Sequence, residues 1–142
     1  MTVDDLIDTF DLLGDWDARY DFITELGEKA PGLPADLRTT DTQVHGCMSK
    51  VWIVGETDDE GGAVLRFHVD GDAPIVRGLA AMLAMIYSER TAAEVLGFDP
   101  EPLFEQLGLD EHLSPNRHVG MYAMVEQIKK ITRELSSRQA SG

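Results

Sequence analysis

The sequence predicts an α+β fold in which helices pack against a small antiparallel sheet of about three strands. Three observations lead to this expectation. Apolar residues repeat with helical spacing over the first thirty positions, two short runs typical of strands lie between residues 51 and 69, and helical spacing returns after residue 74. The length of 142 residues suits one domain. We therefore expect residues 1–142 to form a single domain, with a core over about 6–135 and a frayed, polar C-terminal tail.

Two helices are predicted before residue 31. The first spans Val3 to Leu13 and has its apolar positions on one side, at Leu6, Ile7, Phe10 and Leu13. Asp15 is suited to cap the second, whose apolar positions are Trp16, Tyr20, Ile23 and Leu26. Proline and glycine at 31, 32 and 34 end this helix, and a short helical turn is expected at 34–37 in an otherwise irregular stretch.

The strands are predicted next. Residues 51–54 form a compact β-branched run, and residues 64–69 alternate, with Leu65, Phe67 and Val69 on one face. The polar, glycine-rich residues 58–62 between them have the composition of a hairpin loop. A short extended segment at 43–47 could supply the third strand.

The rest of the chain is predicted to be helical. Pro74 suits the first turn of a helix that Asp72 or Ala73 could cap. Thr91 and Glu94 have the spacing of a capping box, and Asp99-Pro100 and Ser114-Pro115 precede two further helices. The apolar positions of the last helix fall on one face, at Met121, Met124, Val125, Ile128, Ile131 and Leu135.

Charge and composition exclude several classes of function. Lys and Arg number 12 and Asp and Glu number 26, which gives a net charge of −14. Such a chain is poorly suited to bind nucleic acid or an anionic membrane surface. One Cys permits neither an internal disulfide nor a multi-cysteine zinc site, and we expect no metal. The sequence has no membrane-length apolar run and no signal peptide, so a cytoplasmic protein with a reduced thiol is expected.

The negative charge is concentrated in the first half. Residues 1–72 hold 17 acids and 5 bases, whereas residues 73–142 hold 9 acids and 7 bases. This acidic surface could serve solubility or salt adaptation, or it could steer a basic protein partner toward the chain. Composition alone does not separate these interpretations.

The single Cys has an informative context. Cys47 lies in a turn beside Gly46, just before an apolar strand. Chemistry at sulfur requires the thiolate, which nearby His45 and Lys50 could favour, and Ser49 offers a hydroxyl. The alternative is that Cys47 is only a small buried apolar residue.

This segment, Gly-Cys-x-Ser-x-Val-Trp at residues 46–52, resembles the signature of the SufE family, the sulfur-acceptor proteins of iron–sulfur cluster assembly. Three further segments match the family in the same order, at residues 16–27, 72–79 and 112–121. The resemblance covers roughly residues 6–135 and implies a SufE/IscU-like fold. The sequence departs from the family at Met48, where Gln is usual, and at His45, where Pro or Gln is common.

The resemblance implies a specific activity. Family members accept sulfur from a pyridoxal-phosphate-dependent cysteine desulfurase, here a SufS-like partner. The Cys47 thiolate would attack the outer sulfur of the partner's persulfide, stimulate the desulfurase and pass the sulfur to scaffold proteins of the SufBCD-like kind. No cofactor of its own is expected. An iron–sulfur scaffold needs several thiolate ligands, and one Cys therefore favours a carrier.

Two other residues match family positions. Arg117 corresponds to an Arg that takes part in desulfurase docking, although it could simply pair with a surface acid. Asp72 corresponds to a position near the thiol, although it could simply cap the following helix. Two other functions stay open: a regulatory domain that docks on the desulfurase without carrying sulfur, and an independent thiol enzyme.

Overall fold

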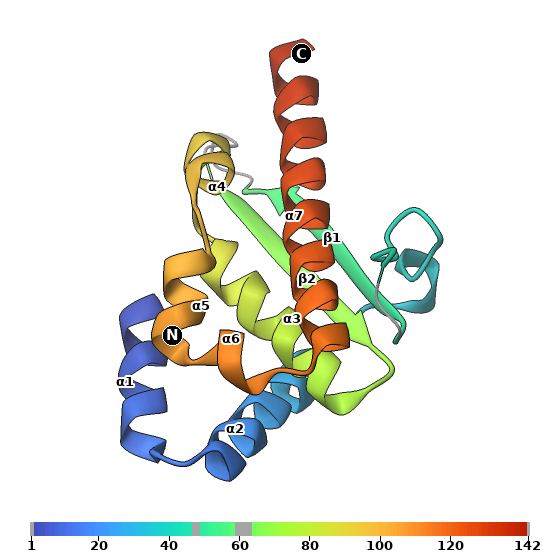
Figure 1. The fold of residues 1–142 in the computed structure, drawn as a ribbon. Coiled ribbons are helices and arrows are strands. Elements are labelled where there is room, and N and C mark those ends of the chain that lie inside the picture. Colours follow the sequence, from blue (N-terminus) through green and yellow to red (C-terminus); the bar gives the residue numbers. More distant parts are fainter. Residues whose placement is uncertain (1, 47–48, 59–63, 142) are drawn as a thin grey trace.

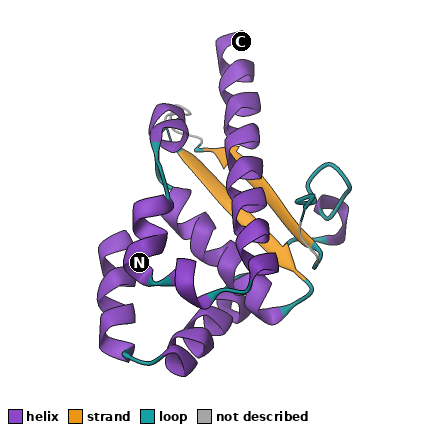
Figure 2. Ribbon diagram, in the orientation of Figure 1, coloured by secondary structure: helices purple, strands orange, loops and turns teal. Residues whose placement is uncertain are grey.

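A two-stranded antiparallel sheet lies among seven α-helices in the part of the chain that the computed structural model describes, residues 2–46, 49–58 and 64–141 (Figures 1 and 2). The α+β class expected from the sequence is confirmed. In chain order the elements are α1 (Val3–Leu13), α2 (Trp16–Lys29), the 3₁₀ turn η1 (Ala35–Leu37), β1 (Val51–Thr57), β2 (Leu65–Gly71), α3 (Pro74–Tyr87), α4 (Ala92–Gly97), α5 (Glu101–Leu107), α6 (Leu109–His112) and α7 (Pro115–Ser141).

The sheet differs from the prediction in its number of strands. β1 and β2 pair from Val51↔Gly71 to Thr57↔Leu65, but the expected third strand at 43–47 is reduced to one isolated bridge between Gln43 and Trp52. Gly46 has a φ of +102°, outside the extended region, so the chain does not continue from this bridge as a regular strand. The predicted hairpin loop lies almost entirely outside the described residues.

One face of the sheet is covered by α3 and α7. Directly paired residues share a face, so Ile53, Gly55, Phe67 and Val69 all face these helices. A Cβ on Gly55 would lie 2.6 Å from Cγ2 of Ile131, and glycine at this position therefore allows α7 to pack closely on β1. This contact sets the second half of β1 against the distal half of α7.

The helix starts follow the sequence signals closely. Thr2 with Asp5, and Thr91 with Glu94, form capping boxes, and Asp15 caps α2. Of the two caps expected for α3, Ala73 and not Asp72 is the N-cap; alanine contributes no side-chain hydrogen bond, and the Asp72 carboxylate accepts from the amide of Lys50 instead. The short helix α6 was not predicted, and α7 continues to Ser141, through the tail that we expected to fray.

The core lies between α3, the covered face of the sheet and the apolar side of α7. Met121, Met124, Val125 and Ile128 of α7 are buried, as their spacing predicts. α2 packs tightly on α3, since a Cβ on Gly78 would lie 2.0 Å from the carbonyl oxygen of Ile23. Among the described residues, no helix is both long and apolar enough to cross a membrane.

Candidate functional site

Backbone hydrogen bonds join the described residues that precede and follow Cys47. The amide of Val44 donates to the carbonyl of Val51 at 2.8 Å, and the amide of Ile53 donates to the carbonyl of Thr42 at 2.9 Å. We call residues 45–50, which connect these bonded positions along the chain, the thiol loop. Cys47 and Met48 themselves lie outside the described residues. The setting of the thiol is defined by the residues on either side.

The first part of the thiol loop runs along α7. Gly46 adopts a positive φ, and a Cβ placed on it would lie 3.4 Å from the Cβ of Ala123. His45 is exposed, and its Nε2 lies 3.1 Å from the carbonyl oxygen of Thr40. Glycine is required here by the backbone conformation, which a side chain would strain.

The last part of the thiol loop is attached to the connection between β2 and α3. Oδ1 of Asp72 accepts a hydrogen bond from the amide of Lys50 at 3.1 Å, and the amide of Asp72 donates to the carbonyl of Lys50 at the same distance. The resemblance to the family predicts that Asp72 lies near the thiol. In the structure it contacts a residue of the thiol loop directly.

A second network, which the sequence analysis missed, fixes this connection. The guanidinium of Arg77 donates to Oδ1 of Asp70 at 2.9 Å and to the carbonyls of Gly27 and Ala30 at 2.8 Å. The other carboxylate oxygen of Asp70 accepts from the amide of Leu33 at 2.9 Å. The end of α2, the end of β2 and the start of α3 are thus joined at one buried carboxylate. The sequence signalled this network only by the presence of Asp70 two residues before Asp72.

Asp70 is held in its charged form. Burial would raise the pKa of its carboxyl group, but the amides of Leu33 and Gly71 and the positive charge of Arg77 outweigh burial and hold the pKa below its usual value. The ionised carboxylate is therefore the form that keeps all these contacts.

A cavity of about 360 Å³ lies between the start of α3 and the start of α7, next to the thiol loop. Its polar lining comes from Ser49, Ser114, Asn116 and Arg117. Its apolar lining comes from Ala73, Ile75, Val76, Leu79, Gly120 and Met124. Arg117 also lines a smaller cavity with Tyr20, Thr24 and Ile75. The two predicted residues Ser49 and Arg117 therefore line the same cavity.

The remaining predicted residues are divided between two places. Asp72 is joined to Lys50 on the α3 side, whereas His45 lies farther along α7, in a separate cavity with Lys130 and Arg133. His112 contributes to neither place, because its ring stacks on Trp16 at 4.2 Å between centroids. Within the described ranges, no three His, Cys, Asp or Glu side chains are grouped so that they could hold a metal ion.

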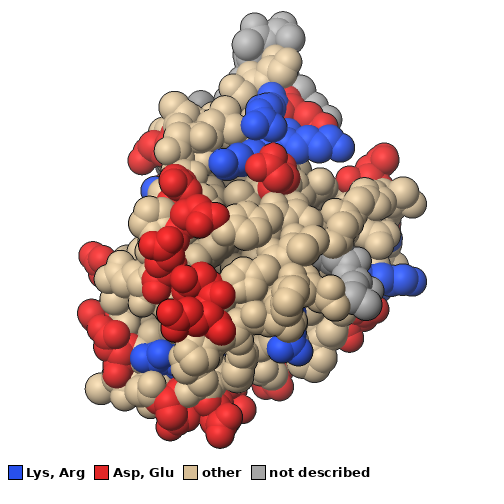
Figure 3. Space-filling view, in the orientation of Figure 1, with Lys and Arg blue, Asp and Glu red and all other residues tan. Residues whose placement is uncertain are grey.

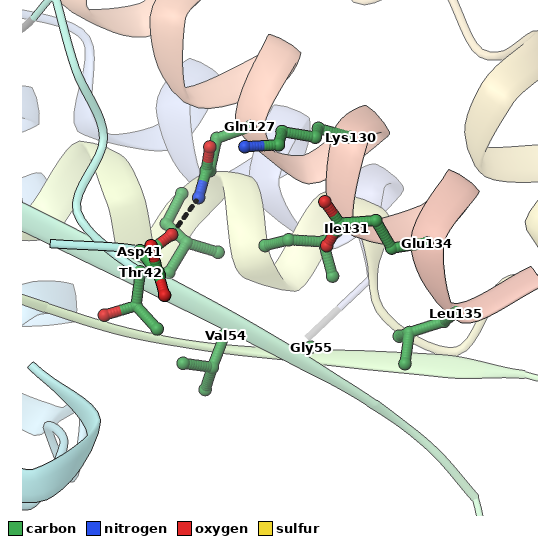
Figure 4. A pocket seen from close by; sticks show the side chains of 10 residues that line it. Asp41, Thr42, Val54, Gly55, Gln127, Lys130, Ile131, Glu134 and Leu135 are labelled. Atoms are coloured by element: carbon green, nitrogen blue, oxygen red, sulfur yellow. Dashed lines mark hydrogen bonds between the residues drawn. The ribbon is translucent and has the colours of Figure 1, made fainter. Parts of the chain in front are cut away.

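Another cavity, of about 370 Å³, lies between β1 and the middle of α7 (Figure 4). Asp41, Thr42 and Val54 line one wall, and Gln127, Lys130 and Glu134 extend from α7 on the other. Gln127 donates to the carbonyl of Asp41 at 3.5 Å, which links α7 to the chain before the thiol loop. Ser49, Asp72 and Arg117 do not line this cavity.

Comparison with known proteins gives a consistent result. Residues 4–132 match the SufE family, described as the Fe-S metabolism associated domain. An uncharacterized SufE-like protein of Rhizobium meliloti (strain 1021) is 40% identical over 129 residues, which cover 90% of this chain and 92% of that protein. Another, from Rhizobium etli, is 39% identical over 130 residues, which cover 91% and 88%. The solution structure of a hypothetical protein from Thermus thermophilus shares the fold, with a TM-score of 0.75, 19% identity and coverage of 95% and 96%.

Proposed function

Because the chain belongs to the SufE family, whose members act in iron–sulfur metabolism, we propose that it carries sulfur on Cys47 from a SufS-like cysteine desulfurase to the machinery that assembles iron–sulfur clusters. The observation that carries the proposal is the position of the chain's single Cys within the family match over residues 4–132. The activity would be exerted in the cytoplasm, with SufBCD-like scaffold proteins as recipients.

The proposed step is a displacement at sulfur. The Cys47 thiolate attacks the outer sulfur of the desulfurase persulfide, a new S–S bond forms on Cys47, and the bond to the desulfurase sulfur breaks. The desulfurase cysteine leaves as a thiolate, so atoms, electrons and charge balance without an oxidant. Carbon–sulfur cleavage of the original substrate belongs to the partner's pyridoxal phosphate, and the carrier needs no cofactor of its own.

The surroundings of the thiol loop support this role. The base of the loop is fixed by the bond between Val44 and Val51, while its two flanks contact different elements, α7 through Gly46 and the β2–α3 connection through Lys50. Because the contacts at the two flanks are few, the flanks can separate from α7 and from Asp72 without unfolding of the core. A carrier needs such a change, since its sulfur must be protected between partners and exposed during transfer.

The cavity beside Ser49 also fits a carrier. The apolar part of its lining comes from α3 and α7, and Arg117 supplies a positive charge. Arg117 makes no side-chain hydrogen bond or ion pair with other described residues, so its guanidinium is available to an incoming partner. We assign Arg117 to docking of the desulfurase on this side of the thiol loop.

The absence of a second Cys from the sequence agrees with transfer to another protein. A resolving thiol on the same chain would attack the persulfide, form an internal disulfide and release the sulfur. With one thiol, the persulfide persists until a partner thiolate reaches it.

The test compares the wild-type chain with Cys47→Ser, using the cognate desulfurase and L-cysteine. Mass spectrometry of the wild-type chain should show one added sulfur atom on the peptide that contains Cys47, and sulfide release by the desulfurase should be stimulated. Both effects should disappear in Cys47→Ser. Stimulation that survives the substitution would instead identify a regulatory domain that docks without carrying sulfur.

A further inference from the structure

α7 carries a group of positive charges that the proposed transfer step does not use. This helix contains five Lys and Arg against two Glu, whereas the whole chain has a net charge of −14. Lys129, Lys130 and Arg133 lie within two consecutive turns, and we call these three residues the basic cluster. Figure 3 shows blue side chains gathered over the distal half of α7, with red side chains next to them and a band of red side chains that runs down the same face from beside the blue group.

The charges of the basic cluster are not neutralised by ion pairs. Where side chains are described, ion pairs join Arg66 to Glu89, His68 to Glu56 and Arg77 to Asp70. None includes a residue of the basic cluster. Lys130 and Arg133 are exposed. Glu126 and Glu134 lie four residues before and after Lys130 and offset part of its charge, but the helix as a whole stays positive.

The basic cluster adjoins the thiol loop. His45, the first residue of that loop, lines a cavity of about 360 Å³ together with Lys130 and Arg133. Ala123, Glu126 and Gln127 complete this cavity, which lies farther along α7 than the cavity of Ser49 and Arg117. The two flanks of Cys47 therefore face two different surfaces, one of them cationic.

We propose that the basic cluster docks an acidic surface of the protein that receives sulfur from Cys47. This inference rests on the proposed function. Without α7 the chain would be more negative than −14, so the net charge repels an acidic partner, whereas the basic cluster attracts it. That attraction orients the partner with its docking surface beside the thiol loop.

The location favours the recipient over the desulfurase. A sulfur carrier meets two partner proteins in turn at the same sulfur atom. It needs a separate surface to recognise each of them. With the desulfurase assigned to the Arg117 side, the surface beside His45 is free for the second partner. The basic cluster thus selects the recipient, and Arg117 selects the donor.

The test measures how fast the chain associates with the cognate SufBCD-like scaffold when the scaffold is immobilised on a surface. Loading of Cys47 by the desulfurase is measured separately. Lys130→Glu and Arg133→Glu should each lower the association rate constant for the scaffold by about threefold to tenfold at low ionic strength. The difference should shrink at high salt. Loading by the desulfurase should be unchanged. Lys29→Glu is the matched control, because it makes the same charge change at an exposed position of α2.

Three results would overturn the proposal: equal association rates for all variants, an equal loss in Lys29→Glu, or slower loading by the desulfurase with normal association with the scaffold. The association rate is measured on the unloaded chain and does not depend on sulfur transfer. If the wild-type chain acquires no sulfur from the desulfurase, the proposed function fails, and the association rates still decide whether the basic cluster docks the scaffold.

Discussion

Lys50 and Asp72 are joined by two hydrogen bonds of 3.1 Å, one from the amide of Lys50 to the Asp72 carboxylate and one from the amide of Asp72 to the carbonyl of Lys50. Lys50 lies just before β1, and the Asp72 carboxylate accepts the hydrogen bond that the Lys50 amide would otherwise make to a neighbouring strand. Because Asp72 follows Asp70 and Gly71, the thiol loop is attached through it to the buried Asp70–Arg77 pair. The position of the thiol loop therefore depends on the connection between β2 and α3.

The first prediction concerns this attachment. Asp72→Ala removes the acceptor of the Lys50 amide, and hydrogen exchange of that amide should become about tenfold faster. Asp72→Asn keeps an acceptor oxygen and should lie between the alanine variant and the wild type. The measurement is amide exchange by NMR, and Asp110→Ala on α6 serves as a control at another exposed acid. Unchanged exchange at Lys50 in Asp72→Ala would show that the bond does not restrain the thiol loop.

The second prediction concerns the buried pair. Asp70→Asn leaves Arg77 without its carboxylate, and we expect the free energy of unfolding to fall by about 2 kcal/mol, measured by urea denaturation near neutral pH. The exposed pair Arg66–Glu89 is the control, and Arg66→Ala should change stability little because both side chains are in water.

The same pair predicts a dependence on pH. The pKa of Asp70 in the folded chain lies below its ordinary value of 3.8, so folding favours the ionised form. The stability that this carboxylate contributes is complete above the unfolded pKa and is lost as the pH falls through the lower, folded pKa. Wild type and Asp70→Asn should therefore converge in stability in acid. A difference that stays constant from neutral pH to acid would contradict the assigned pKa.

Local signals explain what the sequence predicted well. Caps such as Asp15 and Thr91 and the apolar spacing of α7 depend on residues close in the chain, and the structure has them where they were expected. The Asp70–Arg77 network was not predicted, because its acceptors include carbonyls of Gly27 and Ala30, more than forty residues away. The grouping of Ser49 with Arg117, and of His45 with Lys130, likewise depends on how α7 lies on the sheet.

The third prediction uses the backbone of Gly46. With a φ of +102°, Gly46→Ala should lower the free energy of unfolding by about 1–2 kcal/mol or displace the thiol loop. The cause is backbone strain, since the added Cβ would lie at an acceptable 3.4 Å from Ala123. The matched control is Gly97→Ala at the end of α4, where nothing lies within 4 Å of the added Cβ. Thermal denaturation should show little change for the control and a clear loss for Gly46→Ala.

The fourth prediction concerns Tyr87, whose hydroxyl is buried without a hydrogen-bond partner among the described residues. Burial raises the pKa of this phenol to about 12, so the group stays neutral and the cost is that of an unsatisfied hydroxyl. Tyr87→Phe removes the hydroxyl and keeps the edge contact with Phe98. We expect the free energy of unfolding to rise by about 1 kcal/mol in chemical denaturation. A loss of stability would mean that the hydroxyl has a partner, such as a buried water.

The fifth prediction tests the docking role of Arg117 in the proposed function. Arg117→Ala should slow loading of Cys47 by the desulfurase about tenfold, because a half-buried Arg at the edge of an apolar cavity is typical of residues that dominate binding. Arg117→Lys keeps the charge but loses the planar guanidinium and should recover only part of the rate. Stability should be unchanged in both variants, since the side chain makes no ion pair among the described residues.

The readout that separates docking from chemistry is the dependence of loading on desulfurase concentration. A docking role predicts that the Arg117→Ala rate approaches the wild-type rate at saturating desulfurase, because only the encounter is weakened. A rate that stays low at saturation would place Arg117 in the transfer step itself. Arg66→Ala, which removes an exposed Arg from β2, controls for the loss of one positive charge and should load at the wild-type rate. If Arg66→Ala and Arg117→Ala slow loading equally, the effect belongs to net charge, and the cavity beside Ser49 has no part in docking.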